Sequence, residues 1–301
     1  MKRLLKNAWK LAGALMAAGL ILLAIGWTLG ARGGVYADAK GVHIDKNERV
    51  EISKRDIGEF TEISVSTASA DVELVASDHY GIELSYNAQT APEWRVQDGR
   101  LTVKAENKLV ISLFSFNFEG NSIKIYYPEN ARLDSAQITS FSGAVRVSDA
   151  YIAKLQIKNA SGAVTLRHLE GEELILGVIS GRVTLSDSGM SFGRVEIDIS
   201  SGDITAEGLA SRGTKIHAVS GRVRLSGELL GETDVKCVSG DVSVGTTRGE
   251  GEYSYSLKAV SGDVRVDGQR QGNSASRQNA SAENSIAVNT TSGRIDLGFT
   301  K

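Results

Sequence analysis

The sequence predicts an all-β protein, a parallel β-solenoid of coils 19–22 residues long with an N-terminal transmembrane helix. Three observations lead to this fold class. A Ser-Gly-x-(Val/Ile) motif occurs eight times after residue 141, aliphatic and polar residues alternate around each copy, and residues 11–31 carry no charge. Self-similarity at a short period is the sequence signature of repeat architectures such as solenoids.

The first 31 residues predict a basic cytoplasmic tail and a membrane span. Residues 1–10 hold four bases and no acid, and residues 11–31 (LAGALMAAGLILLAIGWTLGA) form the uncharged run. At about 1.5 Å per residue such a run crosses the roughly 30 Å hydrocarbon layer. Bases before a first span favour a cytoplasmic N-terminus, so a single-pass protein with its C-terminal part outside the cell membrane is expected. Ala37-Asp38-Ala39 leaves open a signal peptide that is cleaved there.

The next two segments differ in character. Residues 32–60 are polar and charged, and we expect a linker between membrane and fold. Residues 61–135 begin the β-solenoid (61–301) and hold only one degenerate copy of the motif, Ser69-Ala70-Asp71-Val72, so they are predicted to form an irregular cap region. A cap is expected because an open solenoid end exposes strand edges. Within it, the apolar run Val110–Phe118 is expected to be a core strand, with an exposed binding patch as the alternative.

Residues 136–301 are predicted to form the regular coils. Successive copies are separated by 19, 19, 21, 19, 19, 22 and 31 residues, and begin at Ser142, Ser161, Ser180, Ser201, Ser220, Ser239, Ser261 and Ser292. An aliphatic residue stands four positions before each serine, and another three positions after it. This period of two indicates strands with an apolar inner face, and Ser-Gly between two such runs marks a corner. One coil alone buries too little apolar surface to fold, so the coils must stack.

Two features depart from the regular pattern. Residues 268–285 are polar and low in complexity and account for the 31-residue step, so a mobile surface loop is expected there. Cys237 lies two positions before its serine, where other copies carry Val178, Ile199 or Ala218. We therefore expect its thiol to be buried and unreactive.

The residue two positions after each serine is expected to point outward. Stacked in sequence order, Arg182, Asp203, Arg222 and Asp241 would form an alternating ladder of ion pairs, and Asp263 would follow Asp241. Opposite charges on neighbouring strands contribute about a few tenths of a kcal/mol and help to fix register. The same five residues are also a candidate binding stripe for an anionic polymer or headgroup.

No motif with catalytic chemistry accompanies the repeat. The four histidines are isolated, and the sequence has no CxxC pair, P-loop or G-x-S-x-G motif, so no cofactor or metal site is expected. Asp241 and Asp263 could be a carboxylate pair of a carbohydrate-active enzyme. Like charges also arise simply from a repeat, so we expect no enzyme and assign no catalytic residue. The net charge of −2 disfavours a nucleic-acid partner.

The chain resembles the bacterial putative adhesin family, a family whose domain has no known function. The resemblance covers residues 40–301 and is carried by the apolar N-terminal run, Phe60-Thr61-Glu62-Ile63, Ile125-Tyr126-Tyr127-Pro128 and the Ser-Gly-Asp/Arg-Val coils. It implies an extracytoplasmic β-solenoid, often anchored in the membranes of Gram-positive bacteria. It also implies, for some members, a link to envelope stress systems that respond to antimicrobial peptides. It supplies no catalytic residues.

We therefore expect an extracytoplasmic, membrane-anchored binding or scaffold module in cell-envelope maintenance or stress response. Outward side chains that repeat along a rigid stack let weak contacts add along an extended ligand. The expected partners are a cell-wall polymer, a lipid headgroup, an antimicrobial peptide or an envelope protein. A signalling or structural role through a protein partner is the alternative, and a carbohydrate-active β-helix enzyme is a weaker one.

Overall fold

The computed structural model describes residues 48–88, 91–105, 120–186 and 189–300, together with Gly19 and the backbone of three short strands. These strands are β1 (Gly34–Asp38), β2 (Gly41–Asp45) and β9 (Ile111–Ser112), and β1 pairs antiparallel with the other two. They belong to a compact unit of their own, Met1–Arg49 with Lys108–Glu119. The predicted span at residues 11–31, except Gly19, and the side chains of Val110–Phe118 lie outside the described residues. No helix among the described residues is long and apolar enough to cross a membrane.

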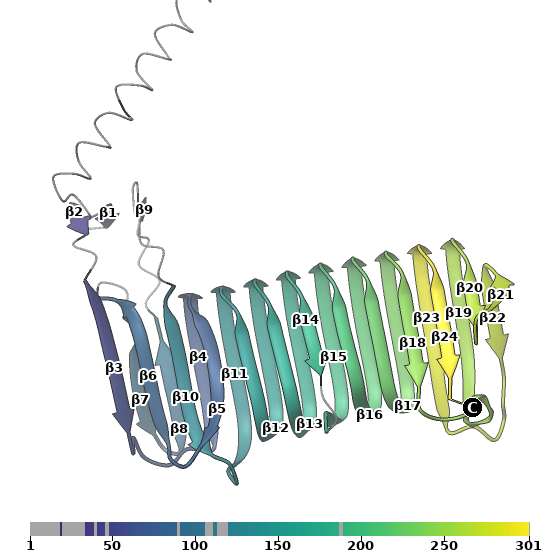
Figure 1. Cartoon of the computed structure of the whole chain (residues 1–301), viewed down its shortest axis with the longest axis horizontal. Helices are drawn as coiled ribbons and strands as arrows, with labels where there is room; N and C mark the ends of the chain where they lie inside the picture. Colours follow the sequence, from purple (N-terminus) through teal and green to yellow (C-terminus); the bar gives the residue numbers. More distant parts are fainter. Residues whose placement is uncertain are drawn as a thin grey trace, which may run out of the picture. The chain divides into compact units, whose positions relative to one another are not determined.

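The second unit, Val50–Asn107 with Gly120–Lys301, is a stack of flattened coils (Figure 1). Each coil has two extended segments, one that leads into the Ser-Gly corner and one that leads away from it. The segments that precede the corner pair with one another from coil to coil, and we call this sheet A. The segments that follow the corner pair in the same way and form sheet B. Several long strands bend at the opposite corner, which we call the far corner, and so contribute one segment to each sheet.

The regular coils stack in parallel and in register. Ser142 pairs with Ser161, Ser161 with Ser180, and the series continues through Ser201 and Ser220 to Ser239. The predicted all-β fold of parallel coils is confirmed. Its strands are β11 (Arg132–Ser142), β12 (Val145–Ser161), β13 (Val164–Ser180), β14 (Val183–Ser186), β15 (Ser191–Ser201), β16 (Ile204–Ser220), β17 (Val223–Ser239) and β18 (Val242–Thr246).

The inner faces of the two sheets form one continuous apolar core. The aliphatic residues three and five positions after the serines are buried, as Val164 and Leu166 illustrate. Removing such a side chain from water contributes about 1.5–3 kcal/mol, and stacking repeats this gain in every coil. Cys237 is buried within the same core, as predicted, and burial raises the pKa of its thiol.

Glycine is required at the Ser-Gly corner because the backbones of neighbouring coils nearly touch there. The eight corner glycines have φ between 123° and 154°, a region that side chains with a Cβ rarely adopt. A Cβ on Gly221 would lie 1.9 Å from the carbonyl oxygen of Gly202 in the adjacent coil. The first copy can carry Ala70 instead. The strands on its outer side are joined through residues 105–121 and not by a Ser-Gly corner, so Ala70 faces no corner glycine there.

At the N-terminal end, strand order departs from chain order. β4 (Glu62–Ser69) and β5 (Asp71–Ser77) form the first coil, while β8 (Arg100–Lys104) and β10 (Ser122–Pro128) stack in parallel on its outer side. Two antiparallel strands then cover this end, β7 (Glu93–Gln97) on β8 and β6 (Gly81–Asn87) on β10. β3 (Arg49–Arg55) pairs with β6. The segment 32–60, expected to be a linker, therefore contributes a strand to the stack.

The C-terminal end differs from the expectation in the order of its coils and in the loop expected at residues 268–285. The last strands, β23 (Asn284–Ser292) and β24 (Ile295–Phe299), lie between β17–β18 and the earlier strands β19 (Tyr253–Ser261) and β20 (Val264–Val266) (Figure 1). The expected loop at 268–285 is wrong. It contains β21 (Gln269–Gly272) and β22 (Ser274–Arg277), which pair antiparallel with β20 and β19 and cover the last coil. A short 3₁₀ helix, Glu250–Glu252, precedes β19.

Candidate functional site

The five predicted site residues lie in one row beside the Ser-Gly corner, but the predicted ladder of ion pairs is wrong. Within the described part of the chain, no ion pair joins Arg182, Asp203, Arg222 or Asp241 to another of the four. The backbone N–H of Arg222 instead donates to Oδ1 of Asp203 at 2.9 Å, and that of Arg294 donates to Oδ1 of Asp241 at 2.9 Å. These aspartates therefore satisfy a backbone donor of the neighbouring coil.

The expected pair of Asp241 and Asp263 does not form, because the last coil intervenes. Arg294 occupies the position between them in the row. Two strand spacings, about 9.6 Å, separate their backbones. Asp263 lies in the outermost coil and accepts from Nη2 of Arg270 in β21 at 2.6 Å. The two carboxylates are thus separated by a whole coil and have different donors, a backbone N–H for Asp241 and a guanidinium for Asp263.

A second row at the same corner was missed from the sequence. It consists of the residue immediately before each serine, and it holds every large hydrophobic side chain that the described residues expose: Phe141 72%, Ile179 62%, Val219 55%, Val238 52% and Val260 67%. We call this row the apolar ridge. Across sheet A its members are Ala68, Phe141, Ala160, Ile179, Ser200, Val219, Val238, Thr291 and Val260. The sequence did contain a signal for this ridge. Side chains alternate between inward and outward along a strand, and this outward position holds apolar residues in most copies.

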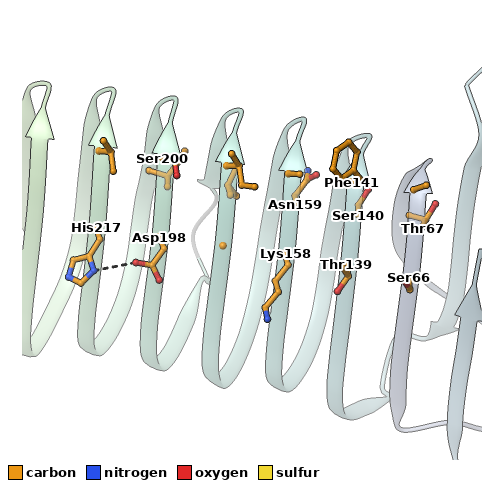
Figure 2. A pocket seen from close by; sticks show the side chains of 17 residues that line it. Ser66, Thr67, Thr139, Ser140, Phe141, Lys158, Asn159, Asp198, Ser200 and His217 are labelled. Carbon is orange, nitrogen blue, oxygen red and sulfur yellow. Dashed lines mark ion pairs between the residues drawn. The ribbon is translucent and has the colours of Figure 1, made fainter. Parts of the chain in front are cut away.

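A shallow groove of about 730 Å³ follows the N-terminal part of the apolar ridge (Figure 2). Phe141 stands at its corner side, while Lys158, Asp198 and His217 lie further along the strands. Nδ1 of His217 is 3.2 Å from Oδ1 of Asp198, and the two side chains point toward one another. Gly177 lies between Lys158 and Asp198 in the polar row beside the ridge. Because glycine has no side chain, the groove is open at this position. The groove is thus apolar on one side and polar on the other.

Buried polar side chains hold the corner behind the groove. Ser140 and Asn159 are each 2% exposed. Oγ of Ser140 donates to the carbonyl of Ser142 at 3.0 Å, and Nδ2 of Asn159 donates to the carbonyl of Gly143 at 3.1 Å. These two bonds tie buried side chains to the backbone of the corner next to Phe141 and Ala160, although Oδ1 of Asn159 has no hydrogen-bond partner among the described residues.

The described surface offers little catalytic chemistry. The histidines whose side chains are described each lie beside one aspartate, at 2.5 Å for His79 and Asp78, 3.0 Å for His168 and Asp149, and 3.2 Å for His217 and Asp198. No group of three or more His, Cys, Asp or Glu side chains among the described residues could hold a metal ion.

Residues 60–298 match the Toastrack family, domain of unknown function 4097, over most of the chain. The chain belongs to this family. Among solved structures, a protein described as a putative adhesin from Bacteroides fragilis is 15% identical and has a TM-score of 0.51, covering 84% of this chain and 98% of that one. A second protein so described, from Parabacteroides merdae, is 14% identical with a TM-score of 0.45, covering 85% and 98%. At 15% identity the likeness to the Bacteroides fragilis protein shows the fold alone. No curated protein sequence matches the chain.

The segments that first carried the family resemblance have structural roles in the Toastrack fold. Phe60, Ile125 and Tyr127 are at most 1% exposed and form the core of the N-terminal end. The hydroxyl of Tyr127 donates to the carbonyl of Ser148 at 3.0 Å. These residues fix the start of the stack and leave its outer face to other side chains.

Proposed function

We propose that this Toastrack protein is a binding module of the cell envelope that displays its coils outside the membrane and binds its ligand along the apolar ridge. One row gathers all the large hydrophobic side chains that the described residues expose, and this observation carries the proposal. Soluble surfaces expose single apolar residues everywhere, but a contiguous apolar patch marks an interaction site. The similar Bacteroides fragilis protein, described as a putative adhesin, agrees with a binding role.

The stack supplies a rigid platform for such binding. Nine ridge positions at about 4.8 Å per coil span about 38 Å. Because every coil is held by ladder hydrogen bonds, the ridge loses little conformational freedom when a ligand lies along it. Contacts that are weak individually then add along an extended ligand.

The proposed function also includes a location for the protein at the membrane and a role in the cell envelope. The uncharged run at residues 11–31 would anchor the chain in the membrane, with the coils on the outer side. Cell-wall polymer, lipid headgroups, antimicrobial peptides and envelope proteins are the partners such a position offers, in maintenance of the envelope or its stress response. We propose no enzymatic activity, because Arg294 separates the two carboxylates that would have served it.

Co-sedimentation of the full chain, kept in detergent so that its apolar N-terminal run does not insert, tests the proposal with purified sacculi and with beads that carry neutral or anionic lipid. A ridge variant carries Phe141→Ser, Ile179→Ser and Val219→Ser. Its matched control carries Thr165→Ser, Thr184→Ser and Thr205→Ser on the outward row of sheet B. We expect binding to at least one ligand class to fall about tenfold or more in the ridge variant, which corresponds to about 1.4 kcal/mol, and to stay unchanged in the control. Equal binding by all three proteins, with circular dichroism confirming the fold, would contradict a role for the ridge.

A further inference from the structure

We infer that the apolar ridge docks on the surface of an anionic lipid bilayer, with the coil axis lying along the membrane. This inference rests on the proposed function and names its ligand. Three observations lead to it: the cations that flank the ridge, the way nearby carboxylates are occupied, and the absence of a closed pocket along the ridge in the described structure.

Cationic side chains stand on both sides of the ridge. On sheet A, two residues before ridge positions, are Lys158, Lys236 and Lys258. Across the Ser-Gly corner, three residues after ridge positions, are Arg182, Arg222 and Arg294. All six are exposed. Lys236 lies 3.0 Å from Asp234, whereas none of the other five forms an ion pair with any described residue.

The carboxylates in the same rows already have donors within the protein. Asp203 and Asp241 accept from backbone N–H groups, Asp198 faces His217, and Asp263 is paired with Arg270. A neutral N–H donor adds no positive charge, so Arg and Asp alternate in the row across the corner, and the cationic excess lies in the sheet A row, where three lysines face one aspartate. The ridge surface is therefore complementary to a layer rich in phosphate oxygens, which Arg and Lys bind through charge-assisted hydrogen bonds.

An apolar row flanked by exposed Lys and Arg side chains is a pattern found in segments that lie in a membrane interface. Their apolar side chains enter the boundary between headgroups and acyl chains, while Lys and Arg extend to the headgroups. The ridge is long and open, and the groove beside it is shallow, so it suits a surface made of many small molecules.

Other occupants fit the ridge less well. Sheet A uses its backbone groups in the ladders between coils, so a peptide cannot add there as a further strand. Phe141 is the one aromatic ring on the ridge, whereas sugar rings bind by stacking on several. A helical protein segment would need depressions that receive its side chains, whereas the ridge presents projecting side chains.

Site-specific fluorescence on the full chain tests the inference. Ser200→Cys places a label in the ridge between Ile179 and Val219, and Thr184→Cys places the same label on the outward row of sheet B. Cys237 is buried and stays unlabelled. Each protein is reconstituted in vesicles of phosphatidylcholine alone or with one quarter phosphatidylglycerol, both containing lipids brominated on their acyl chains.

We expect the label at position 200 to be quenched about threefold more than that at 184 in the anionic vesicles. High salt, or the triple change Arg182→Gln, Arg222→Gln and Arg294→Gln, is expected to abolish this difference. Equal quenching at the two positions, or equal quenching at position 200 in neutral and anionic vesicles, would overturn the inference. Loss of sacculus binding by the ridge variant, without quenching at position 200, would overturn the bilayer as ligand and leave the proposed function standing.

Discussion

The two corners of each coil differ in how much change they accept. The Ser-Gly corner is the same in eight coils, and each carbonyl there lies against the glycine of the next coil. The far corner varies: Asp149 and His168 turn with positive φ, β16 and β17 pair with register shifts, and a 3₁₀ helix occupies Glu250–Glu252. The extra residues of the 21- and 22-residue steps lie there too, between β14 and β15 and between β18 and β19. The repeat therefore varies at the far corner, although Gly171, Gly227 and Gly231 there would each place a Cβ 2.1 Å from a backbone oxygen of the adjacent coil.

The largest expected effect comes from adding one methyl group at each corner. Gly221→Ala places a Cβ 1.9 Å from a backbone oxygen and forces alanine to φ of 126°. We expect unfolding free energy to fall by about 3 kcal/mol or more. Gly251→Ala at the far corner meets no atom within 4 Å and should stay within about 0.5 kcal/mol. Denaturant unfolding measures both, and similar losses would refute the contrast between corners.

A smaller effect is expected from the carboxylates at the two corners. Asp203→Ala removes the acceptor for the N–H of Arg222 and should cost about 1 kcal/mol, whereas Asp203→Asn keeps an oxygen there and should cost less. Glu228→Gln at the far corner breaks an ion pair with Arg248, of 2.6 Å, that solvent screens, so it should cost less than Asp203→Ala. Thermal unfolding compares the three variants. A cost at Glu228 above that of Asp203→Ala would show that the far corner is equally constrained.

The smallest effect at neutral pH concerns the first coil, whose corner has no glycine. Burial raises the pKa of Tyr86 to about 12, and its hydroxyl lies 3.0 Å from Oγ1 of Thr67 beside that corner. An unfolded tyrosine titrates near about 10, so the folded state holds this proton more tightly. The resulting stability is fully present below about pH 10 and is lost as pH rises toward about 12. Denaturant midpoints between pH 8 and 12 should fall more steeply for the wild type than for Tyr86→Phe. Parallel curves would argue against this phenol.

The regular coils could be predicted from sequence because their determinants are local. Alternating aliphatic residues set the inner face, and glycine marks the corner. The row containing Arg182 and Asp203 was located correctly, but the partners of its aspartates were not predicted. Every residue type except proline carries a backbone N–H, so the sequence does not indicate which one a carboxylate accepts from. The apolar ridge was visible as apolar residues at outward positions, yet periodicity directs attention to the buried face.

The ends of the stack could not be predicted for a different reason. Which strand lies beside which is decided by the edges left open once the middle has stacked, and chain order does not record this. β8 with β10, and β23 with β24, therefore occupy positions that their place in the sequence does not suggest. The antiparallel strands at both ends follow the general need to cover exposed edges, although their locations came only from the structure.

Strands β23 and β24 lie between two coils that both precede them in the sequence. β19 and β20 have their parallel neighbours in residues that come later in the chain. A chain that folds while it is synthesised can add coils in order of synthesis as far as β18, and must then hold the next coil apart until its last strands arrive. Completion of this part of the stack thus requires strands that are synthesised after both coils they join, and these strands cannot leave without separating the two coils from each other.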